Sequence, residues 1–471
     1  MMAGMTLAQS HPARISAAIP SLVANLRQSF DAGITRTLDW RLHQLRRLAA
    51  LIEENQDALS EALKQDLGKC AFEAWAGETN FVMAEIRYTI KHLASWMKPK
   101  RVSAPLVVQP AVARVHSDPL GVVLIIAPWN YPLQLALAPL VGALAAGNCA
   151  LVKPSEVAPA SSAALAQLIP KYLDPACVAV VEGGVQETTA VLAERFDHIF
   201  YTGNGTVARI VMEAAAKHLT PTTLELGGKS PCIVDEDADL DVAARRIVWA
   251  KYFNAGQTCV APDYILCHPA VESALLDRIR ATLRDFYGDD PMRSPDYGRI
   301  ISERHHKRLT KLLDSGEKVI GGESDVASRY LAPTVLRNVS PDSPVMADEI
   351  FGPILPVLTV ANIDAAIAFI NKRDKPLALY VFSRNRANVD RVLSETSSGG
   401  ACINDAITHM VAHELPFGGV GPSGMGAYHG RASFDTFTHK KSVLDKANML
   451  DAPIRYPPYT DGKTRWAKRL M

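Results

Sequence analysis

Residues 121–153 read GVVLIIAPWNYPLQLALAPLVGALAAGNCALVK, with no charged residue before Lys153. The continuous apolar run Gly121–Ala127 is typical of a strand that is covered on both faces, as in a parallel sheet. We predict a helix over Pro132–Ala146 and the next strand over Ala150–Lys153. Length alone would also allow a membrane-spanning helix, but the prolines, glycines and polar residues within the stretch favour turns and a short helix between strands.

The same alternation continues outside this stretch. Residues 36–66 carry apolar side chains at helical spacing with charges between them, which predicts an amphipathic N-terminal helical region. Cys177–Val181 and His198–Tyr201 have the pattern of short buried strands, and Glu187–Arg195, between them, has that of a helix. Strands that alternate with helices predict an α/β fold built on a doubly wound parallel sheet.

Composition limits the class of protein. The 471 residues exceed what one hydrophobic core usually holds, so two or more domains are expected. With 48% hydrophobic and 21% charged residues, the chain can bury large sheets. Its formal net charge of +1 provides no general attraction for nucleic acid or acidic lipid, so nucleic-acid binding is disfavoured.

Cysteine usage indicates the compartment. The seven cysteines are an odd number, with no CxxC spacing and no Cys/His cluster of the zinc type, so neither a disulfide framework nor a metal site is expected. Met1–Arg14 lacks the continuous apolar stretch of a secretory signal. Both observations predict a cytoplasmic protein.

Two residues carry the chemistry. Cys259 lies in the sequence QTCVAP, and Glu225 lies earlier in LELGGK. A thiolate is a strong nucleophile toward a carbonyl carbon, and loss of hydride from the adduct leaves a thioester. A carboxylate can activate the water that cleaves it, so the pair is suited to the oxidation of an aldehyde. A free cysteine taken alone is more often a buried apolar side chain.

Six short motifs, in order along the chain, favour the catalytic interpretation. They are APWNYP at 127–132, KPSE at 153–156, ELGGKSPC at 225–232, EIFGP at 349–353, PFGG at 416–419 and SGMGAYHG at 423–430. Together they resemble the aldehyde dehydrogenase superfamily along nearly the whole chain, and most closely its class 3 branch of fatty and aromatic aldehyde dehydrogenases. The resemblance implies a doubly wound Rossmann-like cofactor domain, a second α/β catalytic domain and a small β bridging arm.

The domain boundaries are those that the family implies. The expected parts are a cofactor-binding domain at 1–98 and 122–224, a catalytic domain at 225–428, a bridging and oligomerisation arm at 99–121 and 429–455, and a C-terminal tail at 456–471. The class 3 resemblance also implies a homodimer built partly through the arm.

The turn Gly203–Ala208 fits a dinucleotide-binding fingerprint with alanine in the last place. Backbone N–H groups of Gly203 and Asn204, with the helix that follows, would favour a pyrophosphate; a plain tight turn is the alternative. Glu225 lies about twenty residues farther on, where a ribose-binding acid is sought. The two glycines that follow Leu226 and the family resemblance instead favour a position facing the thiol.

The resemblance assigns further residues to the cofactor. Lys153 and Glu156 match residues that bind the adenosine ribose, with a loop ion pair as the alternative. Since an acid accepts hydrogen bonds from a 2′-hydroxyl and repels a 2′-phosphate, Glu156 favours NAD, with NADP also possible. Glu349 matches the acid that holds the nicotinamide ribose, and Phe351 packs beside the ring; alone, they would be an ordinary acid and a core aromatic. Trp129 is assigned to the same site.

Asn130 follows a predicted parallel strand, where ligands of open sheets gather. Its amide can donate to the oxygen that becomes negative when Cys259 attacks, with the Cys259 N–H as second donor. An Asx-turn beside Pro132 is the alternative. Tyr131, in the same loop, is expected to line the aldehyde entrance.

The predicted reaction is the NAD(P)-dependent oxidation of medium- or long-chain aliphatic aldehydes, or aromatic ones, to carboxylic acids. Two rival functions are an acylating dehydrogenase that uses coenzyme A, against which Glu225 counts, and a non-catalytic protein such as a lens crystallin. Both reactive residues count against the second rival. The tail is basic without an apolar run, which predicts a solvated segment rather than a membrane anchor, with weak contact to anionic lipid as the alternative.

Overall fold

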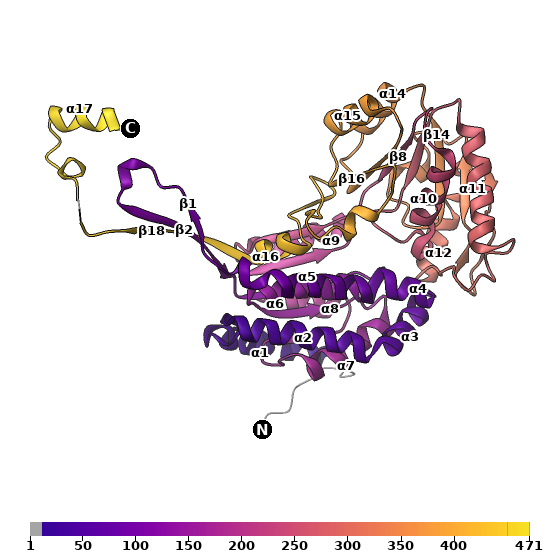
Figure 1. Ribbon diagram of the computed structural model, residues 1–471. Helices are drawn as coiled ribbons and strands as arrows, with labels where there is room; N and C mark the ends of the chain where they lie inside the picture. Colours follow the sequence, from indigo (N-terminus) through magenta and orange to yellow (C-terminus); the bar gives the residue numbers. More distant parts are fainter. Residues whose placement is uncertain (1–11, 450, 471) are drawn as a thin grey trace.

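The computed structural model describes residues 12–449 and 451–470, which form two α/β bodies and a projecting arm (Figure 1). The expectation drawn from Met1–Arg14 falls mostly outside the described residues.

The first body contains a six-stranded sheet in the order β17-β7-β6-β3-β4-β5. Its strands are β3 (Val122–Ile126), β4 (Cys149–Lys153), β5 (Val178–Val180), β6 (His198–Thr202), β7 (Thr222–Glu225) and β17 (Gly424–Met425). All neighbours are parallel except β17, which is antiparallel to β7. The chain runs outward from β3 to β5 and then returns to the other side of β3 for β6 and β7. The sheet is therefore doubly wound, as predicted.

The strand–helix–strand unit predicted within residues 121–153 consists of β3, α6 (Gln134–Ala146) and β4. Every residue of the two strands is buried, which explains why they show no polar alternation. All 13 residues of α6 are buried too, because the helix lies between this sheet and the helices α2 (Leu38–Glu54) and α5 (Asn80–Trp96). No helix in the described part of the chain is long and apolar enough to cross a membrane.

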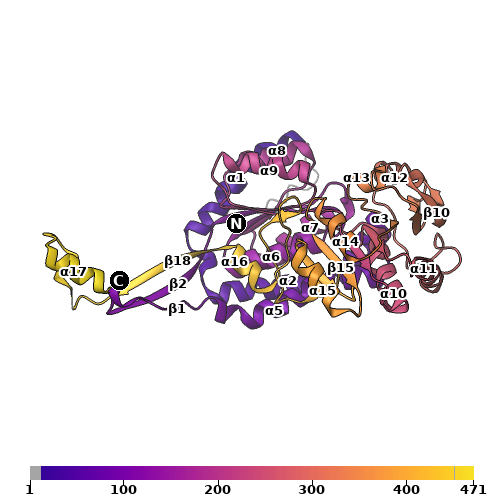
Figure 2. The same ribbon diagram turned by 90° about the horizontal axis from the view of Figure 1, so that it is seen from above.

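Helices cover both faces of the first sheet (Figures 1 and 2). The amphipathic region predicted over residues 36–66 forms α2 and α3 (Gln56–Leu67), and α2 buries Leu45, Leu48, Leu51 and Ile52. The other helices of this body are α1 (Pro12–Asp31), α7 (Pro159–Tyr172), α8 (Val185–Ala193) and α9 (Gly205–Ala216). The strands and the helix predicted between residues 177 and 201 are confirmed to within two residues.

The second body contains a seven-stranded sheet in the order β10-β13-β14-β9-β8-β15-β16. Its strands are β8 (Pro231–Val234), β9 (Tyr264–Cys267), β10 (Glu317–Ile320), β13 (Thr334–Arg337), β14 (Ile354–Thr359), β15 (Ala378–Phe382) and β16 (Gly400–Ile403). All neighbours are parallel except β10, which is antiparallel to β13. Two α/β bodies and a small antiparallel sheet confirm the expected fold class.

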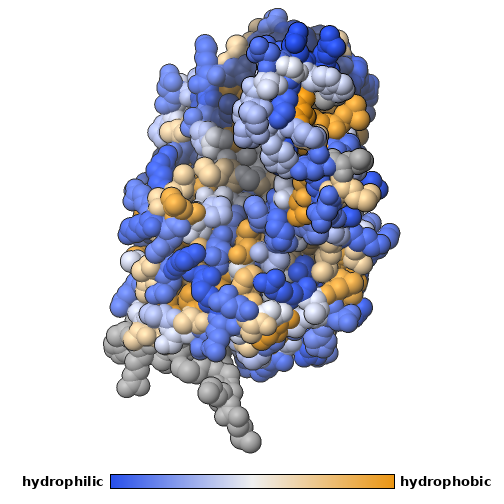
Figure 3. Space-filling view, turned by 90° about the vertical axis from the view of Figure 1, so that its left-hand side faces the viewer, coloured by the Kyte–Doolittle hydropathy of each residue, from blue (hydrophilic) through white to orange (hydrophobic). Residues whose placement is uncertain are grey.

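The arm is an antiparallel sheet of β1 (Lys100–Val102), β2 (Ala111–Pro119) and β18 (Thr438–Lys446), which projects from the first body (Figure 2). β2 is half-buried along its length and β18 is largely exposed, so little of the chain covers this sheet. From the arm side the surface is mainly hydrophilic, with apolar residues scattered over it (Figure 3). Helix α17 (Asp461–Leu470), in the predicted tail, follows the arm.

Two segments that the predicted domain division assigns to other parts of the chain contact the first body. β17, expected in the catalytic domain, extends the first sheet by pairing with β7. Helix α16 (Gly430–Thr436), expected in the arm, packs on α5 and α6, and its Phe434 is fully buried. Both segments are short, and their positions depend on long-range contacts that a local sequence pattern does not reveal.

Candidate active site

The candidate site lies at the carboxyl edge of the first sheet, where β3 and β6 are neighbours. Strand order reverses between these strands, which is the position where open α/β sheets bind ligands. The loop after β3 carries Trp129 and Asn130, the turn after β6 carries Gly203 and Asn204, and Lys153 ends β4. Five predicted site residues from distant parts of the sequence therefore share one edge of the sheet.

Cys259 comes from the second body, in the loop that leads into β9. Just before it, Asn254, Ala255 and Gly256 have φ angles of 55°, 50° and 73°. A side chain at Gly256 would collide with the backbone of Gly352, so only glycine fits there. Left-handed conformations are unfavourable for the other two residues, so surrounding contacts must hold this loop in place.

The side chain of Asn130 forms a hydrogen bond between the two bodies beside the thiol. The Asn130 side chain, 3% exposed, donates from Nδ2 to the Gln257 carbonyl oxygen over 3.1 Å. Because Gln257 is two residues before Cys259, the amide predicted to stabilise a substrate oxygen lies at the loop that carries the thiol.

The environment of Cys259 favours the neutral thiol. Its side chain is partly exposed, and desolvation raises the pKa of the thiol. The neighbouring carboxyl groups of Glu349 and Glu225 raise this pKa further. A base or a positive charge must therefore favour the thiolate before it can attack a carbonyl.

Glu225 ends β7 and is 2% exposed. Neither of its carboxyl oxygens has a hydrogen-bond partner among the described residues, and burial raises its pKa well above the usual value. An unpartnered buried carboxyl with a raised pKa is suited to exchange a proton with a bound water or substrate.

The strand register places Glu225 beside the dinucleotide turn. This position is the one in which motif spacing alone would predict a ribose ligand. Thr202 pairs with Glu225 across β6 and β7, and the Gly203 N–H donates to the Glu225 carbonyl oxygen over 3.0 Å. The dinucleotide turn and the acid are therefore neighbours. The carboxyl nevertheless lies close enough to Cys259 to raise the pKa of the thiol.

Glu349 packs directly against the backbone at Gly227, where any side chain would collide with its carboxylate. Burial raises the pKa of Glu349 well above its usual value. Two residues farther on, Phe351 packs edge-on against Trp129, with ring centroids 5.2 Å apart. His305, which the sequence analysis missed, lies 4.9 Å from the Trp129 ring. The structure thus brings Trp129 and Phe351 together and adds a histidine from α12 (Glu303–Thr310).

Lys153 and Glu156 form the ion pair that was the alternative for them, with Nζ and Oε2 3.5 Å apart. Lys153 is buried, and its Nζ also donates to the Pro154 carbonyl oxygen over 2.6 Å. Burial lowers the pKa of Lys153, while Glu156 acts in the opposite direction. The Glu156 side chain is 48% exposed, so the pair leaves a carboxylate open to a ligand hydroxyl.

Asn204 caps α9, since its Oδ1 accepts from the Val207 N–H over 3.0 Å. The Tyr201 hydroxyl donates to the Asn204 carbonyl oxygen over 3.2 Å and leaves no room for a side chain at Gly203. The turn therefore presents backbone N–H groups and a helix N-terminus beside the capping side chain of Asn204, and such an N-terminus favours an anionic diphosphate.

Tyr131 is buried and packs with Leu135 and Phe253. Its hydroxyl is 2.6 Å from Thr258 Oγ1. Because Thr258 adjoins Cys259, Tyr131 contacts the thiol loop directly. Nothing in the sequence predicts the contact between Thr258 and Tyr131, except that Thr258 is next to Cys259.

Lys229, which lies in the ELGGKSPC motif, is part of a buried ion pair. Its Nζ lies 2.5 Å from Asp263, and the two side chains are 10% and 4% exposed. Lys229 also donates to the carbonyl oxygens of Val345 and Asp348, each over 2.9 Å. The pair therefore supports the segment that carries Glu349.

The chemistry of this edge fits a nicotinamide dinucleotide. The N-terminus of α9 suits the diphosphate, Glu156 and Glu349 offer acceptors for two riboses, and Trp129 and Phe351 offer apolar surface for a ring. Among the residues that the structure describes, no group of three or more His, Cys, Asp or Glu side chains could hold a metal ion.

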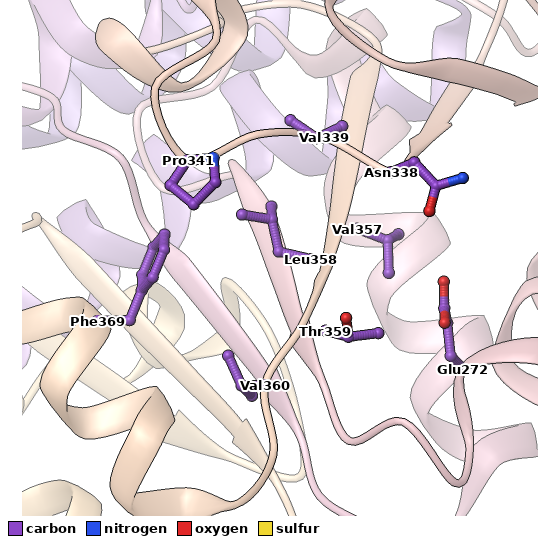
Figure 4. Close-up of a pocket in the computed structure, with 9 residues that line it drawn as sticks. All are labelled: Glu272, Asn338, Val339, Pro341, Val357, Leu358, Thr359, Val360 and Phe369. Carbon is purple, nitrogen blue, oxygen red and sulfur yellow. The ribbon is translucent and has the colours of Figure 1, made fainter.

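A cavity of about 190 Å³ lies away from this site (Figure 4). Glu272, Asn338, Leu358 and Phe369 are among its walls, at the carboxyl ends of β13 and β14. Cys259 precedes the amino end of β9, at the opposite edge of the same sheet. No predicted site residue lines this cavity, so it is separate from the candidate site.

Known proteins that resemble this chain share its family and length. The model of the aldehyde dehydrogenase family matches residues 6–443. Aldehyde dehydrogenase family 3 member A2 of Mus musculus is 52% identical over 451 residues, which cover 95% of this chain and 93% of that protein. The dimeric NADP-preferring aldehyde dehydrogenase of Rattus norvegicus is 51% identical over 442 residues, which cover 93% and 98%.

Solved structures agree. Staphylococcus aureus AldH in its substrate-bound state has a TM-score of 0.94 and 46% identity, over 96% of this chain and 99% of that one. The NAD-dependent aldehyde dehydrogenase of Sinorhizobium meliloti has a TM-score of 0.85 and 31% identity, over 93% and 88%. The resemblance to the class 3 branch is thus confirmed. The chain belongs to the aldehyde dehydrogenase family, among its family 3 members, and is an NAD(P)-dependent oxidoreductase that oxidises aldehydes.

Proposed function

We propose that this enzyme oxidises medium- or long-chain aliphatic aldehydes, and aromatic ones as well, to carboxylic acids through a thioester on Cys259. The Cys259 thiolate bonds to the aldehyde carbon, and the carbonyl oxygen becomes an oxyanion that accepts from Asn130 Nδ2 and from the Cys259 N–H. A bound nicotinamide cofactor supplies the hydride acceptor for this carbon. Glu225 then takes a proton from water as the water oxygen bonds to the thioester carbon. The carbon–sulfur bond breaks and the acid leaves.

The observation that carries this proposal is the unpartnered carboxyl of Glu225 beside the thiol. A buried carboxyl without a hydrogen-bond partner is unfavourable unless a ligand or water completes its environment. A base for hydrolysis gives Glu225 such a partner. An enzyme that passed its acyl group to coenzyme A would have no need of this base.

For the cofactor, Glu156 supports a preference for NAD, because its exposed carboxylate would repel a 2′-phosphate. Lys153, Gly203, Asn204, Glu349, Phe351 and Trp129 complete the proposed cofactor site. One relative is named NADP-preferring, so NADP is kept as a second cofactor.

We also propose a homodimer formed partly through the arm, in a cytoplasmic setting where the seven free cysteines stay reduced. A relative named dimeric supports the assembly. The working domain boundaries are 1–98 with 122–224 for the cofactor domain, 225–428 for the catalytic domain and 99–121 with 429–455 for the arm. β17 and α16 pack on the first body, and 456–471 is the tail.

Kinetics of two variants test the reaction. With saturating cofactor and aldehydes of increasing chain length, we expect no turnover from Cys259→Ala. For Glu225→Gln we expect a burst of about one equivalent of reduced cofactor followed by very slow hydrolysis, because acylation survives and deacylation fails. If Glu225→Gln weakened cofactor binding and left the steady rate intact at saturation, Glu225 would be a ribose ligand. If coenzyme A sped up turnover of the wild type and gave an acyl-coenzyme A product, the acylating reaction would apply.

A further inference from the structure

Beneath the Asn130 loop lies an ion pair with no access to solvent. Lys69 Nζ and Glu78 Oε1 are 2.5 Å apart, and both side chains are 0% exposed. Burying two charges removes them from water, and replacing such a pair with apolar residues is often neutral or stabilising. A contribution to fold stability is therefore a weak explanation for the buried ion pair. The contacts of Lys69 and Glu78 indicate a role in positioning the Asn130 loop.

Lys69 contacts the main chain of Asn130, the residue proposed to stabilise the oxyanion. Its Nζ donates to the Asn130 carbonyl oxygen over 3.0 Å and lies 4.0 Å from the centroid of the Tyr131 ring. Lys69 precedes the short helix α4 (Ala71–Ala74), far in sequence from both residues. One ammonium group thus holds two successive residues of the loop.

Glu78 holds the other end of the same loop. Its Oε2 accepts from the N–H groups of Leu133 and Gln134, over 3.0 and 2.9 Å, at the start of α6. The first N–H groups of a helix have no partner within the helix, and a carboxylate there is favourable. The ion pair therefore fixes both the loop and the helix into which it runs.

The thiol loop contacts the same carbonyl. Asn254 Nδ2 donates to the Asn130 carbonyl oxygen over 2.8 Å and to the Gln257 carbonyl oxygen over 3.1 Å. The Asn130 side chain donates to the Gln257 carbonyl as well. An amide nitrogen carries two hydrogens, and the second on Asn130 has no partner among the described residues. The main chain of Asn130 is thus fixed from two sides, while one N–H of its side chain remains available.

We propose that Lys69, balanced by Glu78, is a positioning residue for oxyanion stabilisation: it fixes the Asn130 backbone so that the free N–H of the amide meets the substrate oxygen on Cys259. This inference rests on the proposed function of Asn130. Oxyanion donors act by being preorganised, and a displacement of about 1 Å can cost about 100-fold in rate. Lys69 itself touches neither substrate nor cofactor.

The test compares two reactions of the same sulfur. Formation of reduced cofactor in a single turnover, with enzyme in excess over aldehyde, requires the oxyanion. Alkylation of Cys259 by iodoacetamide uses the thiol but develops no charge on a carbonyl oxygen. For Lys69→Met we expect the single-turnover rate to fall about 10- to 100-fold, while the alkylation rate changes less than about twofold. The Lys69→Met/Glu78→Gln double variant leaves no lone buried charge and should show the same split if the single variant folds poorly.

Two further variants make the test decisive. Glu272→Gln breaks the ion pair with Arg337 at the opposite edge of the second sheet and should change neither rate. In an Asn130→Ala background, Lys69→Met should lower the single-turnover rate less than about twofold further, because it acts through Asn130. An unchanged rate in both Lys69 variants, an equal fall in alkylation, or a full additional loss in the Asn130→Ala background would overturn the inference. If Asn130→Ala alone reacted at full rate, the proposed role of Asn130 would be refuted first.

Discussion

At Glu73 a buried carboxyl supports the start of the thiol loop. Both of its oxygens lie 3.2 Å from the backbone nitrogen of Asn254, the first of the left-handed residues, and the side chain is 5% exposed. Burial raises the pKa of Glu73 to about 7, with the charge of Lys69 acting in the opposite direction. The loop that carries the thiol therefore rests on a group that titrates near neutral pH.

This raised pKa makes stability depend on pH in a defined direction. Since the native state holds the proton more tightly than the unfolded chain, the contribution of Glu73 is fully present below pH 4.5 and is lost as the pH rises through about 7. Relative to Glu73→Gln, the wild type should lose roughly 3 kcal/mol of unfolding free energy between these limits. Urea unfolding of both proteins across this range measures the loss. A difference that stays constant with pH would contradict the assignment.

At the scale of single residues, short motifs predict Cys259, Glu225 and Asn130 as catalytic residues. The structure brings all three to one region, and their roles remain a proposal. The sequence pattern gives no sign of Lys69 and Glu78, because charged side chains usually face water and neither residue lies in one of the six motifs. Only contacts with a loop about sixty positions away in the chain bury them, and no local pattern encodes such contacts.

At the scale of elements, substitutions of the residue that caps α9 can distinguish an effect on helix stability from an effect on cofactor binding. Its cap, Asn204, is exposed, and aspartate caps a helix about as well as asparagine does. Asn204→Asp should therefore change stability by less than about 0.5 kcal/mol. It should weaken NAD binding about five- to tenfold at low salt, because the new charge repels the diphosphate, and less at high salt.

The matched control is Asn204→Ala. It should lose about 1 kcal/mol of stability with the cap but weaken NAD binding less than the aspartate does. Fluorescence titration with NAD at two salt concentrations, with denaturation curves for each variant, measures both effects. Tight NAD binding by Asn204→Asp at low salt would place the diphosphate elsewhere.

Burial decided which helices and strands could be predicted from the sequence. β3, α6 and β4 were predicted to within a few residues because strands buried on both faces leave an apolar run of recognisable length. The strands of the second sheet were expected only through the family resemblance. β17 has two residues, and its partner β7 lies about two hundred positions earlier, so its pairing follows from tertiary structure alone. The order of the strands in each sheet likewise follows from tertiary structure and cannot be predicted from local sequence patterns.

At the scale of the whole molecule, the arm is the part whose strands are little covered by the rest of the chain. The arm of β1, β2 and β18 has exposed strands and open edges, and a thin antiparallel sheet of this kind is marginal without a packing partner. A second copy of the chain would supply that partner. Sedimentation at micromolar concentration should give twice the 51.1 kDa of one chain. Leu444→Asp, on β18 where the leucine is 51% exposed, should shift the mass toward one chain. A wild type that sediments as one chain would contradict the dimer.

The proposed reaction requires a covalent bond between the Cys259 sulfur and the carbon that becomes the acid. Glu225→Gln, mixed with NAD and a fatty aldehyde and quenched in acid after the burst, should retain the acyl group. Peptide mass spectrometry should then find the mass of the acyl group on the peptide that contains Cys259, in about one copy per chain, and none in Cys259→Ala. An acyl group on another side chain, or full formation of reduced cofactor by Cys259→Ala, would contradict a thioester on Cys259.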